Sequence, residues 1–129
     1  MNQKASFYNL DPDLVMAATE FAGFEPTGEF TQLNSYENRV FDIRLESSTN
    51  VGPVIAKFYR PGRWSQETIL DEHRFLHDLH QEGIHVVAPL KLANDSTVID
   101  FQGLLTSFFP KFRGRMPDEI MPQDLASIG

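Results

Sequence analysis

The sequence has no cysteine among its 129 residues, which excludes disulfide bonds, thiolate metal ligands and thiol nucleophiles. It also has no run of about 18 apolar residues, the minimum for a membrane-spanning helix. Residues 1–8 contain one lysine and no apolar core, so no secretory signal is predicted. Together these features lead us to expect a cytoplasmic protein that does not insert into membranes.

The sequence has fewer basic than acidic residues. The chain has 11 Lys and Arg residues against 18 Asp and Glu residues, which gives a net charge of −7. Phosphate backbones and anionic lipids repel a protein of this charge, so neither nucleic acid nor a membrane surface is predicted as a partner. Apolar residues make up 41% of the sequence, which is enough for one domain with a hydrophobic core.

The first half of the chain predicts one helix followed by three strands. Asp11 is suited to cap a helix that begins with Pro12, and Gly23 is suited to end it. Alternating apolar and polar residues then predict strands at residues 28–34, 39–47 and 54–59. Short connections between them favour an antiparallel meander.

The second half predicts a long helix and further strands. Ser65 is suited to cap a helix over residues 66–81, and Gly83 to end it. Its predicted core stripe consists of Ile69, Glu72, Leu76 and Leu79. Strands are predicted at residues 90–93, 97–100 and 104–109, with a turn at 94–96. The predicted order is helix, three strands, helix and two or three strands. The fold class is therefore α+β, with a five-stranded antiparallel sheet, one long packed helix and an N-terminal helix.

Lys57 and Glu72 are the residues most suggestive of chemistry. Lys57 lies in the middle of an apolar strand and is predicted to point opposite to Ala56 and Phe58. Burying an ammonium group is costly unless an anion compensates it, and Glu72 in the apolar stripe of the next helix could supply that anion. Kinases use such a strand lysine and helix glutamate to hold the phosphates of ATP. The alternative is an edge-strand lysine that reaches water.

Two other segments could contribute to a nucleotide site. The stretch 33–39 contains Ser35 and Asn38, whose small polar side chains suit a phosphate-covering loop, although it has no glycine and could be an ordinary hairpin turn. At the end of the last strand, Phe108 or Phe109 could flank a purine, or both could fill the core.

In combination these segments resemble a known family. The strings LNSYENRVF, VIAKFYRPGRW, ILDEHRFL and FFP…GR are similar to the N-terminal part of the YihE/RdoA-type bacterial stress-response kinases, in the aminoglycoside phosphotransferase and choline kinase-like superfamily. The resemblance implies a protein-kinase-like small lobe within an ATP- and Mg²⁺-dependent enzyme that phosphorylates Ser or Thr of a protein substrate in the cytoplasm.

The resemblance also implies site residues and a domain division. Ser35, Tyr36, Glu37, Asn38 and Arg39 would form the nucleotide loop. Lys57 would hold phosphates, Glu72 would position Lys57, and the backbone from Phe108 through Phe109 to Lys111 would receive adenine. Residues 1–26 would be a helical extension, 27–112 the kinase-like lobe, and 113–129 the start of a connection to a C-terminal lobe.

A catalytic loop does not occur in this sequence, and no catalytic or metal-binding residue is predicted. The family carries its catalytic Asp and its Mg²⁺ ligands in the C-terminal lobe. Residues 100–103 (DFQG) and 77–80 (HDLH) superficially resemble kinase motifs, but the first lies in a predicted hairpin and the second inside a predicted helix. We expect the chain to be the small lobe of a longer protein, to bind nucleotide weakly at most, and to transfer no phosphate.

Three alternatives remain open at this stage. His73, His77 and His80 share one predicted helix face and could bind Zn²⁺ or Ni²⁺, although a solvated polar face is the favoured interpretation. The chain could instead be a non-catalytic interaction module that self-associates through the apolar surface of an isolated lobe. It could also belong to a phosphotransferase for a small molecule such as an aminoglycoside, choline or homoserine.

Overall fold

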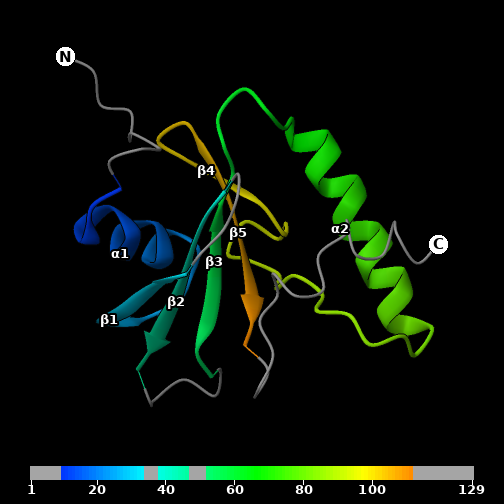
Figure 1. Ribbon diagram of the computed structural model, residues 1–129, viewed down its shortest axis with the longest axis horizontal. Helices are drawn as coiled ribbons and strands as arrows, with labels where there is room; N and C mark the ends of the chain where they lie inside the picture. The colour runs from blue at the N-terminus through cyan, green and yellow to red at the C-terminus, as the bar shows by residue number, and fades with distance from the viewer. Residues whose placement is uncertain (1–9, 34–37, 47–51, 112–129) are drawn as a thin grey trace.

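A computed structural model describes residues 10–33, 38–46 and 52–111 (Figure 1). Its elements, in chain order, are α1 (Pro12–Phe21), β1 (Pro26–Leu33), β2 (Arg39–Leu45), β3 (Val54–Phe58), α2 (Gln66–Gln81), β4 (Ile99–Phe101) and β5 (Leu104–Pro110). Neither helix in this described part is long and apolar enough to cross a lipid bilayer. The predicted α+β class, with five antiparallel strands and two helices, is confirmed.

Local signals set the bounds of both helices. The Asp11 side chain accepts a hydrogen bond from the Leu14 N–H (2.9 Å) at the start of α1. The Ser65 hydroxyl accepts one from the Thr68 N–H (3.1 Å) at the start of α2. Both bonds satisfy backbone donors that have no partner within the first turn of a helix, which is why the predicted starts are confirmed.

The five strands form one antiparallel sheet in the order β1-β2-β3-β5-β4. Strand β3 is therefore central, with β2 on one side and β5 on the other. Lys57 pairs in register with Val40 of β2 and with Ser107 of β5. This central position explains why every residue of β3 is buried.

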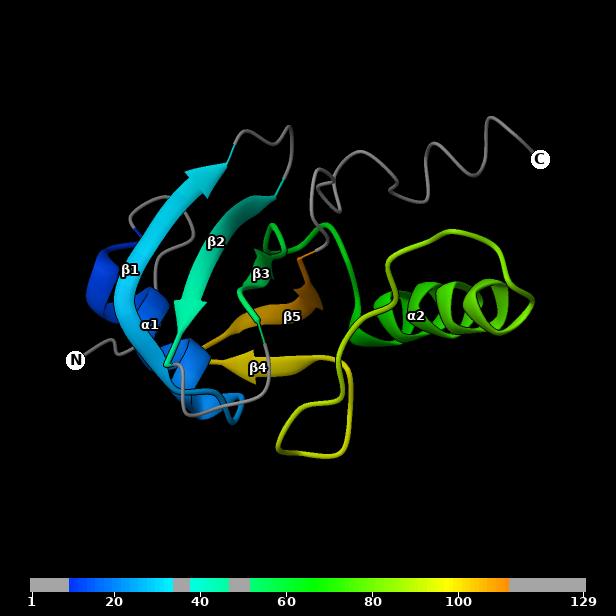
Figure 2. The same cartoon turned by 90° about the horizontal axis from the view of Figure 1, so that it is seen from below.

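The two helices cover opposite faces of the sheet (Figure 1; Figure 2). On the α1 face, alternate strand residues pack with the helix: Phe41, Ile43, Val54, Ala56, Phe58 and Phe108 meet Val15 and Ala18. On the α2 face, the intervening residues pack with that helix: Val40, Ile55, Tyr59 and Phe109 lie in two clusters with Ile69 and Leu76. The period of two along each strand thus separates the core into two layers.

The prediction of a strand at residues 90–93 is wrong. The Leu90 N–H donates to the Phe108 carbonyl (2.8 Å) beside β5, but Leu92 donates to Ser96 (2.7 Å) and Ala93 donates to Ala22 (2.9 Å) at the end of α1. A tight turn and the helix end therefore take the donors that a strand would direct to a neighbouring strand. The remaining edge strand begins at Ile99 rather than at residue 97.

Candidate functional site

Lys57 points toward α2. Its neighbours Ala56 and Phe58 belong to the cluster on the α1 face, and Ile55 belongs to the cluster on the α2 face. Alternation along the strand puts Lys57 with Ile55 and Tyr59. Only 6% of Lys57 is exposed to solvent, so it is a buried lysine in a central strand rather than an edge lysine that extends into water.

Glu72 shares the electrostatic environment of Lys57. It lies on α2 and is half-buried. Burial raises the pKa of the Glu72 carboxyl, and the nearby Lys57 charge opposes that rise. Among the described residues, no ion pair within 4.0 Å joins the two groups, so their attraction acts at longer range.

Lys57 lies against Tyr59, which belongs to a set of polar side chains around His73. The Lys57 Nζ lies 5.2 Å from the centre of the Tyr59 ring. The Tyr59 hydroxyl and the Ser107 hydroxyl lie 3.4 Å and 3.5 Å from His73 Nε2, and His73 Nδ1 lies 2.6 Å from Thr97 Oγ1. Burial raises the pKa of Tyr59, so the phenol stays protonated.

The prediction that His73 belongs to a solvated polar face is wrong. Only 1% of His73 is exposed, whereas His77 is half-buried and His80 is exposed. Burial, with smaller contributions from Lys57 and His77, lowers the pKa of His73 from 6.5 to about 4, so the imidazole is neutral at pH 7. The part of the chain that the structure describes has no group of three His, Cys, Asp or Glu side chains that could hold a metal ion.

A signal for His73 existed in the sequence. His73 lies four residues after Ile69 and three before Leu76, and both of those residues are buried. This is the spacing of one helix face. Because histidine is polar, a solvent-exposed position was predicted for it. Its hydrogen-bond partners Thr97 and Ser107 are distant in sequence, so the sequence pattern did not reveal them.

The predicted nucleotide loop is described only at its end. Ser35, Tyr36 and Glu37 lie outside the described residues. The Asn38 side-chain oxygen accepts a hydrogen bond from the Arg60 N–H (3.2 Å), which ties the start of β2 to the chain just after β3. The Arg39 guanidinium lies 5.7 Å from the Phe41 ring centre, on the side of the sheet opposite Lys57.

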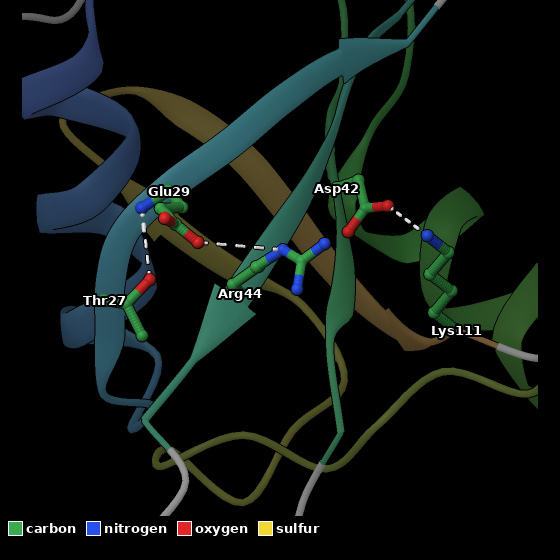
Figure 3. Close-up of polar contacts among 5 residues, drawn as sticks. All are labelled: Thr27, Glu29, Asp42, Arg44 and Lys111. Atoms are coloured by element: carbon green, nitrogen blue, oxygen red, sulfur yellow. Dashed lines mark hydrogen bonds and ion pairs between the residues drawn. The ribbon is translucent and has the colours of Figure 1, made fainter.

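The predicted adenine segment is integrated into the sheet. The side chains of Phe108 and Phe109 are buried in the clusters on the α1 and α2 faces, respectively. The Lys111 N–H donates to the Pro53 carbonyl (3.2 Å), and the Lys111 ammonium forms an ion pair with Asp42 of β2 (Figure 3). Both phenylalanine rings are therefore part of the core, and the Phe108 carbonyl and the Lys111 N–H already have hydrogen-bond partners within the protein.

The sheet brings some of the predicted site residues together and separates others. Lys57, Glu72 and Phe109 lie on the α2 side, whereas Arg39 and Phe108 lie on the α1 side. Asn38 lies beyond the C-terminal end of β3, and Lys111 lies beside Pro53 at the N-terminal end. Lys57 is four residues from Pro53, a separation of about 13 Å along an extended strand.

Residues 29–126 match the phosphotransferase enzyme family (APH). Over its whole length the chain is 38% identical to stress response kinase A of Escherichia coli K12 and to serine/threonine protein kinase RdoA of Salmonella typhimurium, and it spans 38% of the length of each. A solved structure of amicoumacin kinase hAmiN with AMP-PNP and Ca²⁺ is also similar, with a TM-score of 0.69 and 25% identity. That similarity covers 82% of this chain and 32% of the other. The predicted resemblance and the kinase-like small-lobe fold are both confirmed.

Proposed function

The chain belongs to the phosphotransferase enzyme family (APH), and on this premise we propose that it is the nucleotide-binding lobe of an ATP-dependent kinase that phosphorylates Ser or Thr of proteins in a cytoplasmic stress response. The two relatives named as a stress response kinase and as a serine/threonine protein kinase support this choice of acceptor. The neighbour that holds AMP-PNP supports ATP as the phosphoryl donor.

The burial of the Lys57 ammonium, with Glu72 nearby, is the observation that carries the proposal. Removing an ammonium group from water costs several kcal/mol, so an apolar residue would stabilise the centre of β3 better than lysine does. A residue that is unfavourable for the fold but suited to phosphate is typical of a functional position. Lys57 would hold the phosphates and Glu72 would orient it.

The register of the sheet suits an extended nucleotide. The main chain of Phe108–Lys111 lies beside the N-terminal end of β3, and Lys57 lies about 13 Å further along that strand. A nucleotide with its adenine beside Phe108–Lys111 and its phosphates beside Lys57 would lie parallel to β3. The loop before Asn38 would then cover the phosphates, because Asn38 lies beyond the C-terminal end of β3.

ATP in such enzymes binds with Mg²⁺, which neutralises the phosphate charge. The described residues contain no cluster of metal ligands. The resemblance implies that the Mg²⁺ ligands lie in a C-terminal lobe, and the role proposed for this chain is the placement of the nucleotide.

A small-molecule acceptor is the second candidate. The structural similarity to amicoumacin kinase favours it, because that protein binds Ami together with a nucleotide analogue. Sequence identity favours the protein acceptor. The chain is 38% identical to the stress-response kinase over its whole length and 25% identical to the amicoumacin kinase. Both candidate functions require Lys57 to hold the phosphates of ATP.

Replacing Lys57 with Ala is expected to weaken the binding of AMP-PNP by about 10- to 100-fold, because a charged hydrogen bond to phosphate contributes about 1.5–3 kcal/mol. Isothermal titration calorimetry of both proteins measures this change. Lys91→Ala is the matched control, since Lys91 is an exposed lysine paired only with Asp95 in the described contacts. Equal affinities for the wild type and Lys57→Ala would show that the phosphate role of Lys57 is wrong.

The chain by itself is expected to transfer no phosphate, because its sequence contains no catalytic loop. Incubation of the purified chain with radiolabelled ATP and a general protein acceptor should release no product above the rate of a heat-denatured sample. A turnover that persists through purification and is lost in Lys57→Ala would contradict this expectation.

A further inference from the structure

Lys57 is connected to the loop after α2 through two buried side chains. Contacts run from Thr97 to His73, from His73 to Tyr59, and from Tyr59 to Lys57. We propose that Tyr59 is a positioning residue for Lys57, and that His73, held by Thr97, fixes the Tyr59 ring against the ammonium group. This inference rests on the proposed role of Lys57 in holding phosphates.

The Tyr59 ring is placed to orient the ammonium group. Lys57 and Tyr59 are two residues apart in an extended segment, so their side chains emerge on the same side. The Nζ lies 5.2 Å from the ring centre, which is within the range of a cation–π contact. Tyr59 is 2% exposed, so the contact is shielded from water and restricts where the flexible lysine chain can lie.

His73 fixes the Tyr59 ring from the other end. Its Nε2 faces the hydroxyls of Tyr59 (3.4 Å) and Ser107 (3.5 Å), while its Nδ1 faces Thr97 Oγ1 (2.6 Å). The Phe109 ring stands at 87° to the imidazole with centres 5.9 Å apart. With both nitrogens near hydroxyl groups and the ring against Phe109, the imidazole has little freedom to rotate.

This arrangement is compatible with a neutral imidazole. One nitrogen of neutral histidine donates and the other accepts, so Thr97 and the two hydroxyls can all be satisfied without a charge. A second positive charge in this layer would repel Lys57, and the lowered pKa of His73 agrees with that. His73 therefore connects α2, β3, β5 and the loop at Thr97 while leaving Lys57 as the cation.

Two substitutions of His73 test the roles of its two ring nitrogens separately. The amide of Gln can occupy the place of Nε2 and keep the contact with Tyr59, whereas the amide of Asn can occupy only the place of Nδ1 and keep the contact with Thr97. Tyr59→Leu removes the ring, and Tyr59→Phe keeps the ring but removes the hydroxyl. Thermal melts confirm that each variant is folded before it is compared.

The first measurement is the NMR shift of the Lys57 ε-methylene group in nucleotide-free protein, assigned by its loss in Lys57→Ala. Ring currents from Tyr59 should move it upfield in the wild type. We expect the shift to return to the ordinary lysine position in Tyr59→Leu, to decrease in His73→Asn, and to persist in His73→Gln and Tyr59→Phe. A resonance that does not move in Tyr59→Leu would overturn the proposed contact.

The second measurement is the affinity for AMP-PNP. It should fall about 3- to 10-fold in Tyr59→Leu and His73→Asn and stay within about twofold in His73→Gln. Equal losses in His73→Asn and His73→Gln, or no loss in Tyr59→Leu, would overturn the positioning role. If Lys57→Ala leaves the affinity unchanged, the proposed function is wrong instead, and the methylene shifts still decide whether Tyr59 holds Lys57.

Discussion

Acidification from pH 6.5 to pH 4 is expected to reduce the free energy of unfolding by about 3 kcal/mol through His73 alone. Burial lowers the pKa of His73 from 6.5 to about 4. Between these values the unfolded chain binds a proton at His73 and the folded protein does not, so lowering the pH favours unfolding. Each pKa unit corresponds to about 1.4 kcal/mol, and the difference is about 2.5 units.

Other groups titrate in the same range, so a variant is needed to isolate His73. The raised pKa of Glu72 acts in the opposite direction, because the folded carboxyl takes up a proton before the unfolded one does. Urea denaturation at a series of pH values, for the wild type and for His73→Gln, measures both curves. The wild type should lose about 3 kcal/mol more than the variant between pH 6.5 and pH 4.

His77→Gln is the matched control for this experiment. His77 lies on the same helix but is only half-buried, and the variant retains His73. It should therefore keep most of the acid-induced loss of stability. Parallel curves for the wild type and His73→Gln would contradict the buried neutral histidine on which the network around Lys57 depends.

Replacing Phe58 with Ala is expected to reduce the free energy of unfolding by about 3–5 kcal/mol, because a large buried side chain is lost and a cavity is left. Phe58 is completely buried on the α1 face, and its ring meets Phe41 edge-on with the ring centres 5.7 Å apart. Chemical denaturation monitored by circular dichroism measures the change.

Phe75→Ala is the control for Phe58→Ala. Phe75 lies on α2 and is 50% exposed, so its truncation should change stability by no more than about 0.5 kcal/mol. A loss below about 1 kcal/mol in Phe58→Ala would contradict the assignment of Phe58 to the core. Such a result would also question the opposite orientation of Lys57, which is its immediate neighbour in β3.

The alternating pattern of β3 was enough to predict how its side chains divide between the two faces. Ala56 and Phe58 had to share one face and Lys57 the other, whichever helix covered them. The caps at Asp11 and Ser65 also act within one turn of chain, and the predicted bounds of α2 are confirmed. These features depend on residues that are close in sequence.

The predictions for residues whose contacts come from distant parts of the sequence were wrong in two places. The segment 90–93 has strand-like composition, but Ala93 donates to Ala22, far away in sequence. His73 has the spacing of a core residue, but its burial depends on Thr97 and Ser107, which are 24 and 34 residues away. A polar side chain enters a core only where such partners meet it, and no local pattern identifies them.

The sequence by itself determined the order of the elements as far as α2, the helix starts, the two faces of β3 and the family, because caps, alternation and motifs are local properties of the chain. Only the tertiary structure decided that His73 is buried, that Lys111 pairs with Asp42, and that Tyr59 lies against Lys57. The physical reason is that the sheet order and helix packing bring groups together from separate segments, and the burial of a polar or charged group is favourable only in the presence of those neighbours.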